Sequence, residues 1–337
     1  MRKATLIAVP VLLSLAATFW LIAQNRGGPK ADLELLNVSY DPTRELWREL
    51  NDHFTRDWEQ KTGQKVSINQ SHGGSATQAR AIIDGLEADV ATLALFQDTN
   101  AIARKGLLKQ DWMACLPNNS LPYLSTIVFV VRKGNPKGIK DWPDLIRQDV
   151  KIITPNPKTS GNGKLSLLAA YGYVRHKGGS EDEAREFLQK LYANVPVLDS
   201  GARGSTTTFA QKKIGDVHLT WESEAHLEVN ESKGALEMVY PHWSIRAEPQ
   251  VALVDANVDR RGTREVAQRY LDFLFKSTGQ RIIAKHYYRP ADDSYRDHSH
   301  LPDVNLFELK LIASDWDAAQ QRFFADGGVF DRIYQQK

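Results

Sequence analysis

The sequence predicts an α/β protein of two lobes, each a mostly parallel sheet flanked by helices. Strand-like and helix-like segments alternate from residue 33 onward, which is typical of this architecture. The chain has 337 residues, more than a single hydrophobic core usually organises. Two apolar stretches at 124–132 and 247–255 are suited to carry the chain between lobes. We expect one lobe from 31–122 plus 248–337, a second from 123–247, and a ligand cleft between them.

The segments follow one another in a regular order. Residues 33–40 are apolar and rich in strand formers. Residues 42–61 place large apolar side chains at helical spacing, with Asp41 and Pro42 as an N-cap and first-turn pair. The further strands are expected at 65–70, 89–95, 125–133, 151–155 and 216–221. The further helices are expected at 75–86, 100–106, 164–176, 181–195, 264–276 and 315–328.

Residues 1–30 have the layout of an export signal. Arg2 and Lys3 precede an apolar run from Ala4 to Ala23, and polar, Gly and Pro residues end it. The run is long for a signal peptide, so an uncleaved N-terminal membrane anchor is the alternative. Both interpretations export the rest of the chain, which predicts a periplasmic protein.

Charge and cysteine content exclude several classes of function. The whole chain carries +2, but residues 1–30 contain four basic residues and no acid, leaving −2 for residues 31–337. A mildly acidic body argues against nucleic acid as a partner. Cys115 is the single cysteine, so internal disulfides and sites with several thiolate ligands are excluded.

Three segments share a Gly-rich or Ser-rich turn that opens into a helix. They are QSHGGSATQAR (70–80), NPKTSGNGKLS (156–166) and DSGARGSTTTF (199–209). Each follows an expected strand, and open α/β sheets bind ligands at the carboxyl ends of their strands. A helix N-terminus offers unpaired backbone N–H groups and about half a positive charge, so it can hold an anion. Three ordinary capped helix starts are the alternative.

Other motifs are weaker. TSGNGK lacks the first Gly and the final Ser or Thr of a phosphate loop, because Lys158 and Leu165 stand there. Thr77 replaces the second glycine of a nucleophile elbow. The segment 296–300 (RDHSH) has no further ligand at metal spacing and is interpreted as a polar surface loop. We therefore expect neither a metal nor another cofactor, and no enzymatic activity.

At the three turns the sequence resembles the periplasmic sulfate- and thiosulfate-binding proteins of ABC transporters. The resemblance runs from about residue 32 to 334. The stretches that carry it are NVSYDPTRE (37–45), QSHGGS (70–75), ADVATLAL (88–95), TIVFVVRKGNP (126–136), ITPNPKTSGNGK (153–164), LDSGARGSTTTF (198–209), DVHLTWESEA (216–225) and YRP (288–290).

The resemblance implies a type II periplasmic-binding-protein fold that closes on a dehydrated sulfate held by uncharged donors. The implied donors are the backbone N–H groups of Ser75, Gly161, Asn162 and Ala202, the Ser160 hydroxyl and the Trp221 indole N–H. Asn162 stands where some members have a second glycine. Asp41 also lies near the site in the family, and we interpret it here chiefly as the N-cap of the helix at 42–61. Arg203 either pairs with a carboxylate or contributes positive charge near the site without contacting the anion.

The resemblance implies a monomer that captures sulfate, or thiosulfate, and delivers it to the permease subunits of an ABC transporter. A site with donors alone favours sulfate over hydrogen phosphate, because the P–OH group would find no acceptor. A binding protein for another tetrahedral oxyanion, such as molybdate, tungstate or phosphate, is one alternative. A sulfate or phosphate ester hydrolase is another, although no nucleophile–base spacing is visible.

Overall fold

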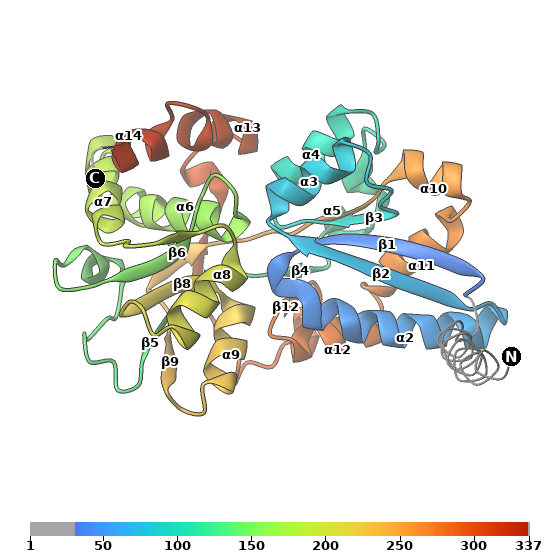
Figure 1. The fold of residues 1–337 in the computed structure, drawn as a ribbon, viewed down its shortest axis with the longest axis horizontal. Helices are drawn as coiled ribbons and strands as arrows, with labels where there is room; N and C mark the ends of the chain where they lie inside the picture. The colour runs from blue at the N-terminus through green and yellow to red at the C-terminus, as the bar shows by residue number, and fades with distance from the viewer. Residues whose placement is uncertain (1–30, 336–337) are drawn as a thin grey trace, which may run out of the picture.

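The computed structural model describes residues 31–335, and these form two α/β lobes side by side (Figure 1). The predicted α/β class is confirmed. The expected export signal or anchor, residues 1–30, lies outside the described residues. Within residues 31–335 we find no helix of the length and apolarity needed to cross a bilayer.

Lobe I is built on a four-stranded sheet of order β11-β3-β1-β2. Neighbours β1, β2 and β3 run parallel, and β11 is antiparallel to β3. The strands are β1 (Leu33–Tyr40), β2 (Val66–Gly73), β3 (Val90–Thr92) and β11 (Val251–Leu253). The helices are α2 (Arg44–Thr62), α3 (Ser75–Ile83), α4 (Phe96–Arg104), α5 (Pro117–Ser120), α10 (Asp255–Arg261), α11 (Arg264–Phe273) and α12 (Ser277–Lys285).

Lobe II is built on a five-stranded sheet of order β7-β6-β8-β5-β9. Strand β6 is parallel to β7 and β8, whereas β5 is antiparallel to both of its neighbours, so this sheet is mixed rather than mostly parallel. The strands are β5 (Ile127–Arg132), β6 (Ile152–Pro155), β7 (Leu198–Asp199), β8 (Val217–Trp221) and β9 (Leu236–Val239). The helices are α6 (Gly161–His176), α7 (Glu181–Ala193), α8 (Ala202–Thr206) and α9 (Glu222–Glu231).

The chain crosses between the lobes three times. The first two crossings lie near Ser125 and Ala247, which pair in an antiparallel bridge, close to the two apolar stretches expected to carry them. The third crossing follows β12 (Arg289–Pro290), which pairs with β4 (Tyr123–Leu124), and ends at β13 (Asn305–Phe307), which pairs with β10 (Trp243–Ile245).

This third crossing places the C-terminal segment on lobe II, not on lobe I as the division at 248–337 assumed. Helix α14 (Val329–Gln335) packs against α7, and α13 (Trp316–Ala319) lies between α14 and α4 of lobe I (Figure 1). The cause is apolar packing. Phe307, Phe323 and Phe330 are buried in the core that contains Leu165, Leu188 and the rest of α6 and α7. Burying such side chains is worth about 1.5–3 kcal/mol each, which outweighs the entropy of one more crossing.

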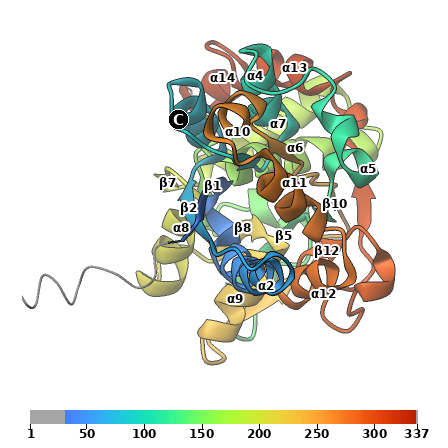
Figure 2. The same cartoon turned by 90° about the vertical axis from the view of Figure 1, so that its right-hand side faces the viewer.

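The amphipathic helices cover the sheets as their spacing predicts. In α2 the buried side chains are Leu46, Trp47, Leu50, Asn51, Phe54 and Trp58, and Gly63 ends the helix in a left-handed C-cap at φ 74°. Figure 2 looks onto lobe I, with α10 and α11 in front of α6 and α7 of lobe II, and Figure 1 shows α3 and α2 on opposite sides of β1 and β2.

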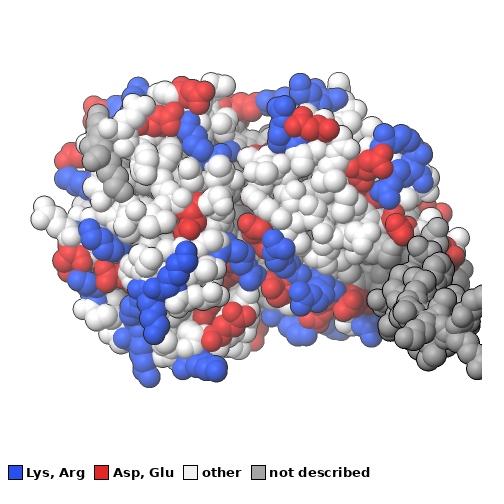
Figure 3. Space-filling view, viewed as in Figure 1, with Lys and Arg blue, Asp and Glu red and all other residues white. Residues whose placement is uncertain are grey.

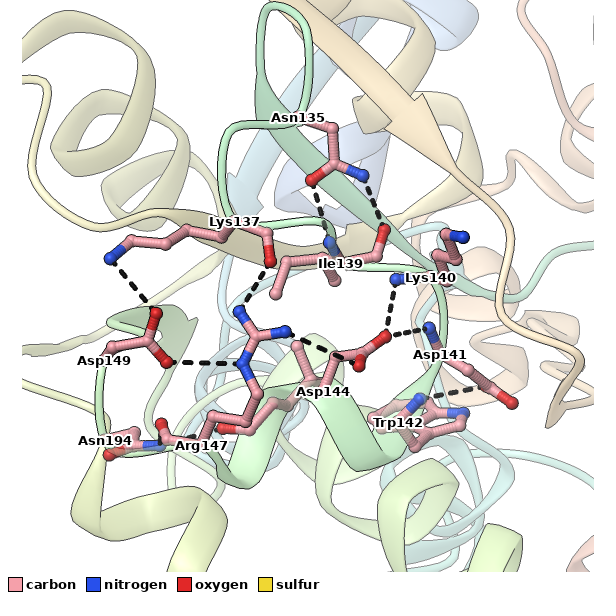
Figure 4. A network of polar contacts seen from close by, with 11 residues as sticks. Asn135, Lys137, Ile139, Lys140, Asp141, Trp142, Asp144, Arg147, Asp149 and Asn194 are labelled. Atoms are coloured by element: carbon pink, nitrogen blue, oxygen red, sulfur yellow. Dashed lines mark hydrogen bonds and ion pairs between the residues drawn. The ribbon is translucent and has the colours of Figure 1, made fainter.

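The loop between β5 and β6 is ordered by its own polar contacts (Figure 4). Asn135 exchanges two hydrogen bonds with the backbone of Ile139, at 2.7 and 2.9 Å. Asp141 and Asp144 form a capping box at the following short helix, and Arg147 pairs with Asp144 and Asp149. These contacts stabilise the outer end of lobe II, away from the cavity between the lobes.

Candidate anion site between the lobes

A small cavity lies where the two lobes meet. Lobe I and the carboxyl ends of β6, β7 and β8 in lobe II both contribute to its lining. All seven residues that the sequence suggested line it, although they are up to 180 positions apart in the chain: Asp41, Ser75, Ser160, Gly161, Asn162, Ala202 and Trp221. Tyr40, Pro42, Gly73, Gly74 and Ala94 complete the lining.

The first turn of α3 presents a backbone donor from lobe I. Gly74 is the N-cap, and the helix starts at Ser75, whose N–H therefore has no acceptor within the helix. The Ser75 hydroxyl oxygen accepts a hydrogen bond from the Ala94 N–H at 3.1 Å. This bond fixes α3 to the end of β3, so the orientation of the Ser75 N–H is held by two elements.

The first turn of α6 presents donors from lobe II. Ser160 is the N-cap, and its Oγ accepts from the Gly163 N–H at 3.4 Å, which leaves the hydroxyl proton free to donate. The N–H groups of Gly161 and Asn162 are the first two of the helix and have no intrahelical acceptor. The dipole of this 16-residue helix adds positive potential at the same point.

Helix α8 contributes the third turn. Gly201 is its N-cap and Ala202 its first residue, so the Ala202 N–H is also without an intrahelical acceptor. The turn is tied to the α6 turn, because the Thr159 hydroxyl donates to the Ser200 carbonyl at 2.8 Å. The two lobe II turns therefore form one connected rim.

Trp221 ends β8 and supplies an aromatic donor. Its side chain is 1% exposed, and its ring lies 5.4 Å from that of Tyr40 in lobe I. Its indole N–H has no hydrogen-bond partner among residues 31–335. An indole N–H donates and cannot accept, so this group on the cavity lining is suited to an acceptor that enters the cavity.

Glycines allow the two lobes to touch around the cavity. A Cβ on Gly74 would lie 2.6 Å from the Thr159 carbonyl oxygen, and one on Gly201 would lie 2.7 Å from Asp41 Oδ2. A Cβ on Gly161 would lie 2.8 Å from the Ala94 Cβ. Each pair joins one residue from lobe I with one from lobe II. The Gly-rich turns were predicted from the sequence, but these contacts between the lobes were not.

The cavity contains no unpaired charge. Asp41 is the one carboxylate among the described lining residues, and it pairs with Arg44 at 2.9 Å. The interpretation of Asp41 as the N-cap of the long helix is wrong. A short 3-10 helix from Asp41 to Thr43 precedes α2, and no side-chain cap bond is made at either start. Pro42 fixes φ at this start, which favours the 3-10 turn.

Arg203, whose role the sequence left open, pairs with two carboxylates. It lies 2.6 Å from Glu45 of α2 and 3.0 Å from Glu224 of α9. Burial raises the pKa of Glu224 to about 8, although the neighbouring Arg203 lowers it. Positive charge next to the site is thus matched by acids. Figure 3 likewise shows acidic and basic side chains interspersed over this face of both lobes.

The remaining motifs lie elsewhere. The loop 296–300 is at the surface, where His300 pairs with Asp297 at 2.9 Å, and residues 31–335 contain no group of three His, Cys, Asp or Glu arranged to hold a metal. Cys115 is exposed, although a free cysteine is usually a small buried apolar residue. The reason is that it ends a short 3-10 helix whose buried member is Trp112.

The fold and the cavity define a class of protein: a two-lobed receptor that encloses a small solute where its lobes meet. Residues 43–289 match the model of the bacterial extracellular solute-binding proteins, and the chain belongs to that family.

Its relatives include a sulfate-binding protein of Escherichia coli (strain K12), 51% identical over 306 residues, which cover 90% of this chain and 93% of that protein. A thiosulfate-binding protein of Pseudomonas aeruginosa is 47% identical over 312 residues, 91% of this chain and 94% of that one. Among solved structures, the sulfate-binding protein SubI from Mycobacterium tuberculosis H37Rv has a TM-score of 0.79 at 28% identity, covering 87% of this chain and 99% of that chain.

Sequence reasoning missed two features of the site. Tyr40 packs its ring against Trp221, and Thr159 brings its carbonyl to Gly74. Tyr40 is the last residue of β1, and α/β sheets bind ligands at the carboxyl ends of their strands. Its position could therefore have predicted its place in the site. Thr159 carried no such signal, because its role depends on the opposite lobe.

Proposed function

We propose that this protein is a periplasmic receptor that captures sulfate and delivers it to the permease subunits of an ABC transporter. The observation that carries the proposal is the convergence of uncharged donors in one small cavity. The proposed ligands are the N–H groups of Ser75, Gly161, Asn162 and Ala202, the Ser160 hydroxyl and the Trp221 indole. Sulfate accepts hydrogen bonds on all its oxygens, so it matches a set of donors.

The same donors support discrimination against phosphate. Hydrogen phosphate must donate one hydrogen bond, and the lining offers one carboxylate, Asp41, already paired with Arg44. A buried donor without an acceptor costs about 1–3 kcal/mol, which corresponds to roughly a 5- to 150-fold preference for sulfate.

Thiosulfate is the second candidate, because a relative that is 47% identical over most of its length is a thiosulfate-binding protein. Replacing one oxygen by a larger, weaker acceptor changes little in a cavity lined with donors. The geometry therefore supports sulfate and thiosulfate alike, and the sulfate-binding relatives favour sulfate.

Isothermal titration calorimetry with sulfate, thiosulfate, molybdate and phosphate tests the proposal. We expect sulfate or thiosulfate to bind most tightly and phosphate at least tenfold more weakly. Sulfate at a hundred times its Kd should also stabilise the protein by about 2.7 kcal/mol. Failure of every tetrahedral anion to bind would contradict the proposal. Turnover of an aryl sulfate or aryl phosphate would instead indicate an enzyme.

A further inference from the structure

The side chain of Asn162 makes a contact that its proposed role as a backbone donor does not require. The residue is 1% exposed. Its Nδ2 donates to the Leu219 carbonyl of β8 at 3.3 Å, and its Oδ1 accepts from the Ser166 hydroxyl at 3.2 Å. Both hydrogen bonds are buried, so the amide is held between the first turn of α6 and the strand β8.

The position of Leu219 gives this contact its significance. The parallel pairing of β6 with β8 ends at Ile153 and His218, so Leu219 is the first residue of β8 beyond it. The Asn162 amide continues the hydrogen bonding of β8 where β6 no longer provides a partner. Trp221, with its unpaired indole N–H, is two residues further along the same strand.

We propose that the Asn162 side chain is a positioning and specificity-determining residue for the anion site. This inference rests on the proposed function. By bonding to Leu219, the amide sets the spacing between the α6 donors, Gly161 and Asn162, and the Trp221 indole of β8. A glycine at position 162 would keep the backbone donor but would lose this link.

A fixed spacing selects for the size of the anion. Hydrogen bonds to a charged acceptor are short and weaken steeply as the distance grows, so donors held at one spacing favour one anion radius. Donors fixed before binding also avoid an ordering cost on binding. Removing the link should therefore lower the affinity for the best-fitting anion most and the affinity for a larger tetrahedral dianion least.

The test is Asn162→Ala, with titrations of sulfate and of molybdate as the larger dianion. We expect about a tenfold weaker sulfate affinity, as for loss of one buried hydrogen bond. We expect a smaller loss for molybdate, so that the sulfate-to-molybdate affinity ratio falls at least threefold. Ser166→Ala is the matched control, because it removes the neighbouring bond and leaves the Leu219 link. It should change both affinities less than threefold.

The possible outcomes separate the explanations. Sulfate affinity of Asn162→Ala within twofold of the unaltered protein overturns the inference. Equal losses for sulfate and molybdate also overturn it, since they indicate a general structural effect. If Asn162→Ala does not fold, as judged by its unfolding midpoint without ligand, Asn162→Gly carries the same expectations. Failure of the unaltered protein to bind either anion overturns the proposed function instead.

Discussion

Gly74→Ala is expected to prevent full contact between the lobes without damaging either lobe. Gly74 has φ −60° and ψ 134°, which any residue adopts, so alanine introduces no backbone strain. Its Cβ would lie 2.6 Å from the Thr159 carbonyl oxygen of the opposite lobe. Thr159 cannot easily yield, because its hydroxyl donates to Ser200 and its N–H to Asn156.

The magnitude follows from this geometry. Ordinary contact begins at 3.4 Å, so the lobes would remain about 0.8 Å further apart at this point. A hydrogen bond of about 2.9 Å lengthened by that amount is no longer a hydrogen bond. At least the donor from Ser75 would be lost to an anion held by lobe II. A hydrogen bond to a charged group is worth about 1.5–3 kcal/mol, so sulfate affinity should fall roughly 10- to 150-fold.

Calorimetry with sulfate measures this loss, and the unfolding midpoint without ligand shows whether the fold is intact. Gly73→Ala is the matched control on the same turn, because its Cβ would meet only the Gln78 side chain, at an ordinary 3.5 Å. We expect the control to stay within threefold of the unaltered protein. Sulfate affinity of Gly74→Ala equal to that of the control would refute the reasoning.

Three further predictions address single side chains. Trp221→Phe keeps an aromatic side chain, although a smaller one, and removes the indole N–H, so calorimetry should show sulfate affinity falling about tenfold or more; an unchanged Kd would remove the indole from the site. Asp41→Asn should change sulfate affinity less than about threefold, because Arg44 already offsets the carboxylate; a loss of phosphate affinity relative to sulfate would contradict a donor-only site, since it would show that the carboxylate accepts from hydrogen phosphate. His226, stacked on Tyr287, is buried, and burial lowers its pKa from 6.5 to about 4. The unfolded state therefore binds the proton more readily, and stability is lost as pH falls from about 6.5 to 4. The loss at pH 5 is about 2 kcal/mol, so urea unfolding at pH 7 and pH 5 should show a smaller drop for His226→Gln; equal drops would show that His226 does not titrate in this way.

The order of elements was accessible from the sequence because it depends on local periodicity. The apolar spacing in α2 and the strand-like run at 127–132 are examples. In each, the pattern of residues within the segment itself predicts which side chains are buried. Helices α5, α9, α10, α12 and α14 have no counterpart among the expected helices. Helix α9 buries charged residues, Glu222 and Glu224 among them, so its pattern does not show an apolar stripe.

The three turns were also accessible, since glycine and hydroxyl residues at a helix start have a local physical reason to bind anions. What each side chain contacts was not. Asp41 looked like a helix cap but pairs with Arg44, and Arg203 is bound between Glu45 and Glu224 of different lobes. Such pairings depend on segments far apart in the chain, and one sequence does not record which distant segments meet.

The amino-acid sequence by itself determined the α/β class, the two-lobed plan and the three turns that can hold an anion. These follow from short-range patterns and from residue chemistry that holds in any context, whereas the individual donors were implied by the resemblance to sulfate- and thiosulfate-binding proteins. The tertiary structure decided that the C-terminal segment packs on lobe II, that Gly74 meets Thr159, and that the Asn162 amide reaches Leu219. Each of these depends on how apolar surfaces fit together across the whole molecule, and that fit is a property of the folded chain rather than of any segment.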